Sequence, residues 1–449
     1  MKKLETLILS YCPKLCKIPE IQTSMDNLVE LSLSRTGIEI VPSSIGQCCT
    51  NLVSLHLRDC LNLQSIEGNF HLLKHLQLLY LDCCFQLKNI PTEGLFGVEC
   101  RLNVLSLSWD NLLRGAVNEF LGFPRFLRKL NLGGCNLVDE DISFIYWEEL
   151  SNLQVLDLSA NNFSRLPSSL SQLLHLKFVD LSNCNNLVEL PDLPSSISVL
   201  IAHGCTSLKI GDFPTNHLKW LWKVTLSTSN CNGERALQSM LQGNAIEDYF
   251  ISILFQECYV PIRGFALGRF KLQLPWNWYN EFSGFLVYVD KVRWASREVI
   301  VIKDVLGMEN GDGVLEVSNK PDHDDDDDDD DDEERMTAEG MCYVSFGSLR
   351  NTSWWNSTHT TLSFSLQYNC YLKVELVPRR SQGDDDSTGI GRAKDATYLS
   401  NFWDEELVNR KTFKIIGDSK SSIKILWDTG IESDMFSPSP LFGIYRTLN

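Results

Sequence analysis

Several familiar motifs are absent from the sequence. No CxxC pair occurs among its fifteen cysteines, so neither a zinc site of that spacing nor a thioredoxin-like motif is predicted. HExxH, GxSxG and the P-loop pattern GxxxxGK[ST] are missing too, which leaves hydrolase and nucleotide-binding interpretations without a motif. No apolar run approaches the ~20 residues of a membrane span, and no apolar signal segment follows Met1. We therefore expect a non-enzymatic protein without cofactor, metal or membrane span, with reduced thiols, in the cytoplasm or nucleus.

A basic face is also missing. The net charge is −18, so binding to nucleic acid is not indicated. Twelve acidic residues lie between Asp322 and Glu334, including the unbroken run Asp324 to Asp332. Like charges repel each other and cannot pack, so residues 320–336 are expected to form a disordered acidic insert. Binding of Ca²⁺ or of a basic partner is the alternative, but the run lacks the glycine and carbonyl spacing of a calcium loop.

What the sequence does contain is an eleven-residue line, best seen at Leu52 to Leu63, with leucine at positions 1, 4 and 6 and cysteine at position 9. Its nine copies begin 21 to 26 residues apart, the spacing of a leucine-rich repeat. They start at Leu4, Leu28, Leu52, Leu76, Leu102, Leu127, Leu153, Leu176 and Ile197. The fold class predicted is an α/β leucine-rich-repeat solenoid with a curved parallel sheet.

The period of a strand predicts which residues face inward. Leu55 and Leu57 lie two apart and share one face, and only stacked repeats can bury such leucines. Position 9 follows the strand, where a small side chain can pair with backbone groups of the turn. Six of the nine residues at this position are cysteine. The nine are Cys12, Thr36, Cys60, Cys84, Asp110, Cys135, Asn161, Cys184 and Cys205.

Beyond Pro214 the repeat pattern ends. Glu234 to Leu254 shows roughly helical apolar spacing, which predicts one or two helices at a junction over residues 214–258. From Tyr259 the period becomes two, as in Gly284 to Val289 and Tyr371 to Val377. This pattern is typical of a mainly-β sandwich or jelly-roll-like domain. The predicted domains are thus a solenoid over 1–213, the junction, a sandwich over 259–430 and a tail over 431–449.

Binding candidates come from the side of each repeat that faces away from the leucines, because the concave surface of such solenoids is where partners bind. Rings and arginines dominate protein-binding hot spots. The candidates are Arg35, His56, Arg58, Asp59, Tyr80, Asp82, Trp109, Asp157, Phe178, Asp180 and His203. The Asp157 and Asp180 carboxylates share position 5 and resemble a paired-acid site, but the solenoid register alone places them side by side, so a solvated face is expected rather than catalysis. Trp276, Trp278 and Tyr279 are either a contact surface of the tail or part of its core.

The repeats resemble those of plant intracellular immune receptors with an amino-terminal TIR domain, a nucleotide-binding domain and leucine-rich repeats (TIR-NBS-LRR disease resistance proteins). The residues that carry this are Cys12-Pro-Lys-Leu15, Cys60-Leu-Asn-Leu63, Val41-Pro-Ser-Ser-Ile-Gly46 and Leu190-Pro-Asp-Leu-Pro-Ser-Ser196. The tail resembles the post-repeat jelly-roll domain (C-JID) of the same class through Lys271 to Asn280 and Phe282 to Val289. No cap precedes Leu4, so the chain is expected to be the C-terminal part of something longer, or a truncated product, without the TIR and nucleotide-binding domains.

The resemblance implies recognition of a protein partner, a pathogen effector or domains of a receptor, as part of innate immunity and plant defence. A truncated decoy or regulator that acts on a full-length receptor is the alternative. An extracellular repeat receptor would carry LxGxIP spacers and a signal sequence, and neither is found.

Overall fold

The computed structural model describes residues 3–67, 70–88, 101–109, 123–190, 192–209, 221, 223–227, 251–256, 266–293, 297–305, 337–367, 370–379 and 413–428. The chain divides into two compact units, the repeat unit (Met1–Asn244 with Glu432–Asn449) and the post-repeat unit (Ala245–Ile431). The acidic insert expected over 320–336 lies outside the described residues. The limits predicted for the domains stay a prediction.

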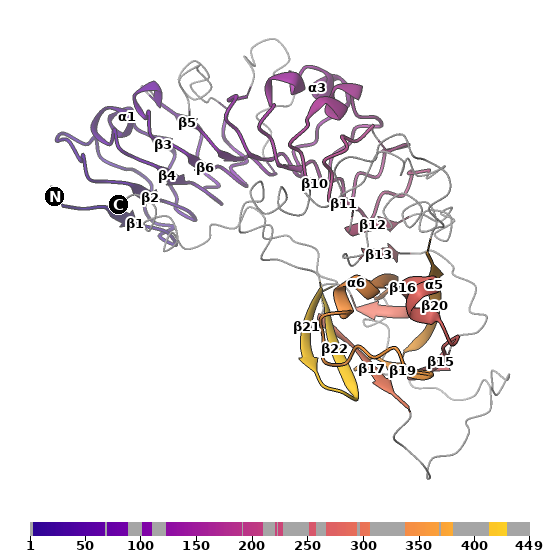
Figure 1. The fold of residues 1–449 in the computed structure, drawn as a ribbon. Coiled ribbons are helices and arrows are strands. Elements are labelled where there is room, and N and C mark those ends of the chain that lie inside the picture. Colours follow the sequence, from indigo (N-terminus) through magenta and orange to yellow (C-terminus); the bar gives the residue numbers. More distant parts are fainter. Residues whose placement is uncertain are drawn as a thin grey trace, which may run out of the picture. The chain divides into compact units, whose positions relative to one another are not determined.

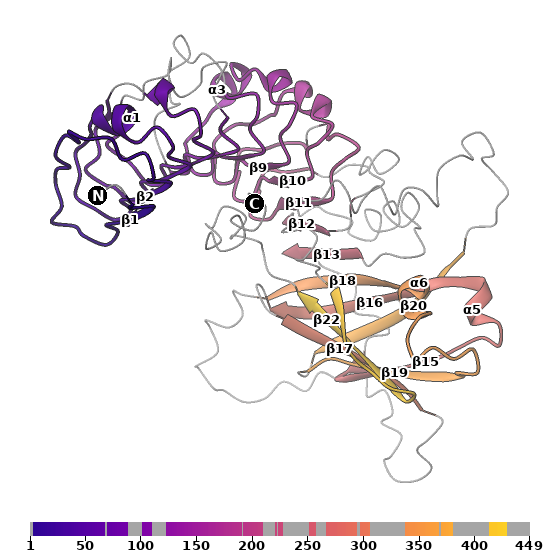
Figure 2. The ribbon, with the colours of Figure 1, turned by 60° about the vertical axis from the view of Figure 1, so that its left-hand side comes forward.

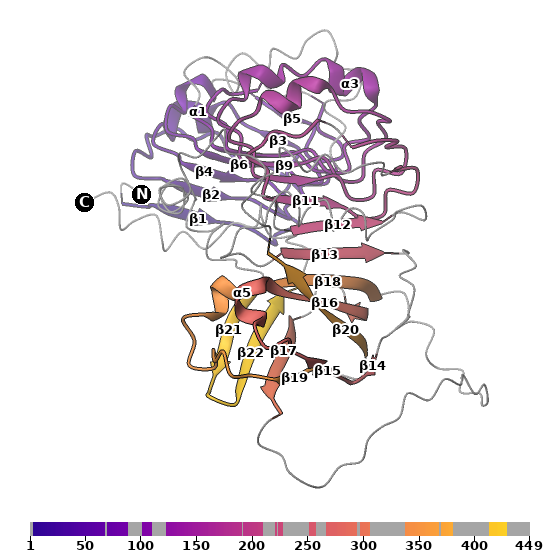
Figure 3. The ribbon, with the colours of Figure 1, turned by 45° about the vertical axis from the view of Figure 1, so that its right-hand side comes forward.

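Each of the nine repeats contributes one short strand to a parallel sheet, as the leucine line predicts. Figure 1 shows these strands along the inner side of the curved repeat unit, and Figure 3 shows several of them side by side. Their order in the sheet follows the sequence. They are β1 (Thr6–Ile8), β2 (Glu30–Ser32), β4 (Ser54–His56), β6 (Leu78–Tyr80), β7 (Val104–Ser106), β8 (Lys129–Asn131), β9 (Val155–Asp157), β10 (Phe178–Asp180) and β11 (Val199–Ala202).

A tenth strand, β12 (Lys223–Ser227), continues this sheet, which corrects the expectation that the repeat pattern ends near Pro214. It pairs in parallel with β11, with Val224 opposite Leu200. Leu221, Val224 and Leu226 are buried at the spacing of positions 1, 4 and 6. The repeat line therefore has one more copy.

The other side of the repeat unit carries short helical pieces and one small sheet. Figure 1 shows α1 and α3 on the outer side of the arc. The pieces are α1 (Ser44–Cys48), η1 (Phe70–Leu72), α3 (Asp139–Ser143), η2 (Trp147–Glu149) and η3 (Ser168–Gln172), while β3 (Ile40–Val41) pairs in parallel with β5 (Ser65–Ile66).

The leucines at positions 4 and 6 form the core of the repeat unit. Leu55, Leu57, Leu156 and Leu158 are all fully buried. Position 9 closes this core as predicted, because thiols there donate to the position-6 carbonyl of the preceding repeat. Cys60 Sγ reaches Leu33 O at 3.2 Å, and the same contact of 3.0 to 3.2 Å recurs at Cys84, Cys135, Cys184 and Cys205. Asn161 makes the equivalent contact with Leu132 O through its amide at 2.9 Å.

The post-repeat unit contains two antiparallel sheets, which confirms the predicted sandwich (Figure 2). One runs in the order β13 (Ile251–Gln256), β18 (Thr337–Ser345), β16 (Phe282–Arg293), β20 (Tyr371–Pro378) and β14 (Ala266–Leu267). The other has five strands in the order β15 (Arg269–Gln273), β19 (Thr361–Ser365), β17 (Arg297–Asp304), β22 (Ser422–Asp428) and β21 (Phe413–Asp418). Two short helices, α5 (Trp278–Glu281) and α6 (Phe346–Leu349), complete it.

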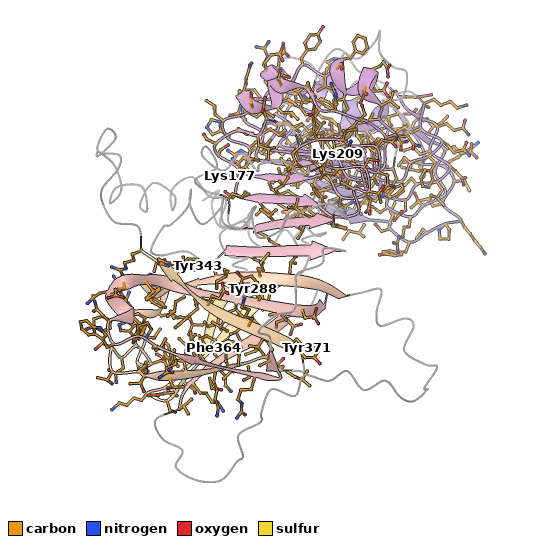
Figure 4. The ribbon with its side chains drawn as sticks, turned by 90° about the vertical axis from the view of Figure 1, so that its right-hand side faces the viewer. Lys177, Lys209, Tyr288, Tyr343, Phe364 and Tyr371 are labelled. Atoms are coloured by element: carbon orange, nitrogen blue, oxygen red, sulfur yellow. The ribbon has the colours of Figure 1, made fainter. Side chains whose placement is uncertain are left out.

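Aromatic and branched side chains from both sheets share one core. Phe285 of β16, Phe364 of β19 and Trp427 of β22 are fully buried in it. Phe285 and Phe364 meet edge to face with ring centroids 5.1 Å apart, and Figure 4 labels Phe364 in the interior of the unit. Period-two alternation on each strand therefore builds a two-layer β unit.

The junction helices are not seen where the structure describes the junction. Residues 251–256 form strand β13, antiparallel to β18, whereas 228–250 lie outside the described residues. The sequence Ile251-Ser-Ile-Leu-Phe255 is rich in β-branched and aromatic residues, which favour a pleated strand. The helical spacing inferred across Ile253 and Leu254 was wrong for that reason.

Candidate recognition surface

Four predicted residues form one interlocked cluster on the sheet face of repeats three and four. The His56 and Tyr80 rings stack with centroids 4.9 Å apart. The Arg58 guanidinium lies 4.4 Å from the Tyr80 ring centroid, and its Nε donates to Asp82 Oδ2 at 2.6 Å. His56 and Tyr80 occupy position 5 of successive repeats, while Arg58 and Asp82 occupy position 7. The parallel register of β4 and β6 brings them together.

The Asp82 carboxylate is held from two directions. Ser106 and Ser108, from the next repeat, both donate hydroxyl hydrogen bonds to its Oδ1, the second at 2.6 Å. Its Oδ2 accepts from Arg58, whose side chain keeps 25% of its surface exposed. A charged pair fixed by extra hydrogen bonds loses little freedom when a partner binds.

Burial sets the charge of His56. Its pKa falls to about 4, chiefly because burial disfavours the cationic form, and the nearby Arg58 charge lowers it further. The ring is therefore neutral near pH 7. Its Nε2 lies 2.6 Å from Ser54 Oγ and 3.7 Å from Glu30 Oε1. With a neutral ring, the Glu30 contact is not an ion pair.

The acidic column at position 5 caps the turns after the strands. Asp157 Oδ1 accepts from Ser159 N at 2.9 Å, and Asp180 Oδ1 accepts from Ser182 N at 2.8 Å. Asn131 makes the same contact with Gly133 N.

A solvated face was expected around Asp157 and Asp180, but neither side chain is fully exposed to solvent. Asp180 is buried and Asp157 is half-buried, and the two are opposite each other on β9 and β10. Burial first, and repulsion by Asp157 second, raise the pKa of Asp180 to about 7. Burial also raises the pKa of Asp157. Their carboxyl oxygens bond to turn backbone, so the pair has a structural role in the repeats.

Position 8 forms a second column, at the turn that ends each strand. Every position-8 residue has a positive φ, from 52° to 71°. Each N–H in this column, from Tyr11 to Asn183, donates to the position-7 carbonyl of the next repeat at 2.7 to 2.9 Å. The column, here called the turn ridge, comprises Tyr11, Arg35, Asp59, Cys83, Trp109, Gly134, Ala160, Asn183 and Gly204.

Three predicted residues belong to this turn ridge rather than to the sheet face. Arg35 Nε donates to Asp59 Oδ2 at 2.9 Å, and its guanidinium lies 5.1 Å from the Tyr11 ring centroid. Trp109 is 54% exposed. The sequence analysis did not select Tyr11. The column could have been found from Gly134, Asn183 and Gly204, because glycine and asparagine favour a positive φ.

Phe178 and His203 lie apart from both groups. Phe178 is almost fully buried, as is Tyr80 of the cluster, so the expectation of large rings on a wet face is wrong for both rings. Phe178 is the first residue of β10 and position 3 of its repeat, and all three residues of this strand are buried. His203 is half-buried, and burial lowers its pKa.

In the post-repeat unit the three aromatic candidates separate. Trp278 is fully buried, and its Nε1 donates to His359 O at 3.1 Å. Tyr279 packs partly buried against the same core, with its ring 6.1 Å from that of Trp278. Trp276 is 86% exposed, which leaves it as the contact candidate of the three.

Within the described ranges, no group of three or more His, Cys, Asp or Glu residues could hold a metal ion. In the same part of the chain, no helix is both long and apolar enough to cross a membrane.

Comparison with known proteins identifies the relatives of the chain. The Leucine Rich Repeat family model matches residues 152–173. TMV resistance protein N from Nicotiana glutinosa is 32% identical over 258 residues, which cover 51% of this chain and 22% of that protein. Disease resistance protein RPS4 from Arabidopsis thaliana is 33% identical over 185 residues, 41% of this chain and 12% of its own length.

Among solved structures, the functional domain of InlJ from Listeria monocytogenes, described as including a cysteine ladder, matches with a TM-score of 0.34 and 13% identity over 52% of this chain and 56% of that chain. Internalin C2 of the same organism matches with a TM-score of 0.28 and 20% identity, over 51% of this chain and 82% of that chain. The chain spans less than a quarter of the length of N and RPS4. About half of the chain is thus homologous to plant disease resistance proteins of the TIR, nucleotide-binding and leucine-rich repeat type, and its repeat unit is a leucine-rich-repeat solenoid.

Proposed function

We propose that the chain is a non-catalytic protein-recognition module of an intracellular plant immune receptor. It binds a protein, a pathogen effector or a domain of the receptor, through the concave side of its repeats. The observation that carries this proposal is the cluster of His56, Arg58, Tyr80 and Asp82. The arginine is fixed between a ring and a carboxylate while part of its side chain stays accessible. Preorganised arginines and rings are the residue types that contribute most to protein binding.

The post-repeat unit supplies a second contact region in this proposal. Its two antiparallel sheets around one core support its assignment as the jelly-roll-type domain of that receptor class. Trp276 is an outward aromatic side chain of this unit, whereas Trp278 is buried in its core. Substitution of Trp276 by alanine is expected to weaken recognition without loss of stability, because the indole buries little surface in the free protein.

The test of the concave cluster uses a charge swap. Arg58→Glu places a second acid beside Asp82 and is expected to abolish interaction with partners found in a two-hybrid panel of effector proteins. The milder variant Arg58→Gln removes the positive charge and leaves the buried Asp82 carboxylate with its two serine donors. It is expected to fold like the wild type and still lose the partner. If both variants keep every interaction, the concave cluster is not the recognition surface.

A further inference from the structure

The residues on the turn ridge change character along the repeat unit. Repeats six, eight and nine place Gly134, Asn183 and Gly204 there, residue types that tolerate a positive φ. Repeats one, two and five place Tyr11, Arg35 and Trp109 at the same backbone angle, with φ of 63°, 58° and 59°. A bulky residue in the left-handed region is strained, because its Cβ approaches the following carbonyl oxygen.

Packing does not compensate for this strain. Tyr11 is 70% exposed, and the Arg35 side chain is 57% exposed. Exposed large side chains in an unfavourable conformation gain little from the solenoid core. The repeat geometry imposes a positive φ at all nine position-8 residues, so the turn itself does not explain why three of them carry a large side chain.

The exposed side chains are nevertheless held in place. Arg35 stacks over Tyr11 and uses Nε for Asp59. Among the described residues its terminal NH₂ groups have no hydrogen-bond partner. The Trp109 indole covers the backbone of Gly134 so closely that a Cβ on that glycine would overlap with it. One indole face therefore rests on Gly134, and the exposed surface of Trp109 points outward.

Two further apolar side chains lie in the same turns. Leu61 and Phe85 occupy position 10 of repeats three and four, between the repeats that carry Arg35 and Trp109, and each is 52% exposed. The turns of repeats two to five thus present an arginine at one end, an indole at the other and apolar side chains between them.

We propose that this part of the turn ridge, with Leu61 and Phe85, docks a protein segment that brings a carboxylate to Arg35 and an apolar side chain to Trp109. The proposal rests on the proposed function for the partner being a protein, and it adds a surface distinct from the cluster around Arg58. Arg35 pairs bidentately with a carboxylate through its free NH₂ groups. A polyanion such as nucleic acid is disfavoured, because Asp59 lies beside Arg35 and the chain carries a net charge of −18.

The experiment selects peptides from a random phage-displayed library on the immobilised full chain and measures their dissociation constants for variants. Selected peptides are expected to combine Asp or Glu with a large apolar residue. Arg35→Gln and Trp109→Gly should each weaken them at least about tenfold. Gly134→Ala leaves Trp109 in the sequence but displaces its indole, and should weaken them similarly. Phe126→Ala, which removes another exposed ring of the repeat unit, serves as the matched control and should change nothing.

Stability provides an independent readout. Tyr11→Gly relieves strain and removes an exposed ring, so its melting temperature should equal or exceed that of the wild type. A lower melting temperature for Tyr11→Gly would show that the ring is structural and would overturn the strain argument.

The two proposals fail in different ways. Peptides that lose affinity with Arg58→Gln but not with Arg35→Gln or Trp109→Gly would overturn the turn ridge and leave the concave cluster standing. Peptides that lose affinity only with the ridge variants support the ridge alone. If no peptide prefers the wild type over a combined Arg35→Gln and Trp109→Gly variant, the turn ridge is not a docking surface.

Discussion

Replacement of Asp180 by asparagine should stabilise the repeat unit above neutral pH. Asp180 is buried opposite Asp157, and its pKa is raised from 3.8 to about 7 by burial and then by the neighbouring carboxylate. In the unfolded chain the carboxyl has its ordinary pKa. Between pH 3.8 and about 7 the folded state therefore holds a proton that the unfolded state has released. The contribution of this group to stability is complete below pH 3.8 and is lost as the pH rises through 7.

The magnitude follows from the separation of the two pKa values. It corresponds to about 4 kcal/mol as an upper limit, because each pKa unit is worth about 1.4 kcal/mol. Asparagine avoids this loss and keeps the carbonyl oxygen that accepts from Ser182 N. The chain already contains this arrangement, since Asn131 at the same position of repeat six accepts from Gly133 N at 2.9 Å.

The assay is urea unfolding of the full chain at a series of pH values from 4 to 8.5, followed by circular dichroism. The difference in unfolding free energy between Asp180→Asn and wild type should grow with pH and reach its plateau above about pH 7. The effect of Asp157→Asn should have the same sign, because this change also removes the charge that repels the Asp180 carboxylate. An Asp180→Asn protein that is less stable than wild type at pH 8, or whose pH profile is parallel to that of the wild type, would refute the claim that a protonated carboxyl is retained on folding.

Three further outcomes test the packing. Cys184→Ala should destabilise the repeat unit by about 1 to 3 kcal/mol because Leu158 O loses its thiol donor. Cys184→Ser restores a donor and should destabilise the unit less, which the urea unfolding midpoints of the two variants would show. Gly284→Ala should lower the melting temperature of the post-repeat unit, at a cost of about 1 to 3 kcal/mol, because the new Cβ would meet the Tyr343 ring and Val344 O at 2.5 Å. Trp278→Ala should destabilise the post-repeat unit by about 3 to 5 kcal/mol, because loss of a fully buried indole leaves a cavity. For Gly284→Ala and Trp278→Ala, calorimetry should show an unchanged unfolding transition of the repeat unit.

Much of the fold could be predicted because its elements follow simple periods. The leucines at positions 4 and 6 determined the sheet, and the small residues at position 9 indicated the thiol contacts that close it. Strand β12 was not recognised, since Ser229 stands where a cysteine or asparagine is expected at position 9. Strand β13 was taken for helix because its apolar residues satisfy both periods over a short run.

The candidate surface was only partly predictable, for a geometric reason. Alternation assigns a residue to one side of a strand, but it does not say where the strand ends. Arg35, Asp59 and Trp109 lie beyond that end, in the left-handed turn, and so belong to a different surface from His56 and Tyr80. Alternation also cannot show that neighbouring side chains cover one another, which is why Tyr80 and Phe178 are buried on the face that was expected to be wet.

Positions 8 and 9 are adjacent in sequence but have opposite physical roles. Position 9 points inward, where the thiol of Cys135 lies 3.0 Å from Leu107 O, so its size and its donor are both constrained. Position 8 of repeats one to eight bonds to the next repeat through its backbone N–H, as Trp109 N does to Gly133 O at 2.7 Å. That bond does not depend on the side chain, so the side chain at position 8 can change without loss of the repeat-to-repeat bond or of core packing. The turn ridge is therefore the place where the solenoid can acquire a new binding specificity for only the modest cost of a left-handed residue, about 1 to 2 kcal/mol.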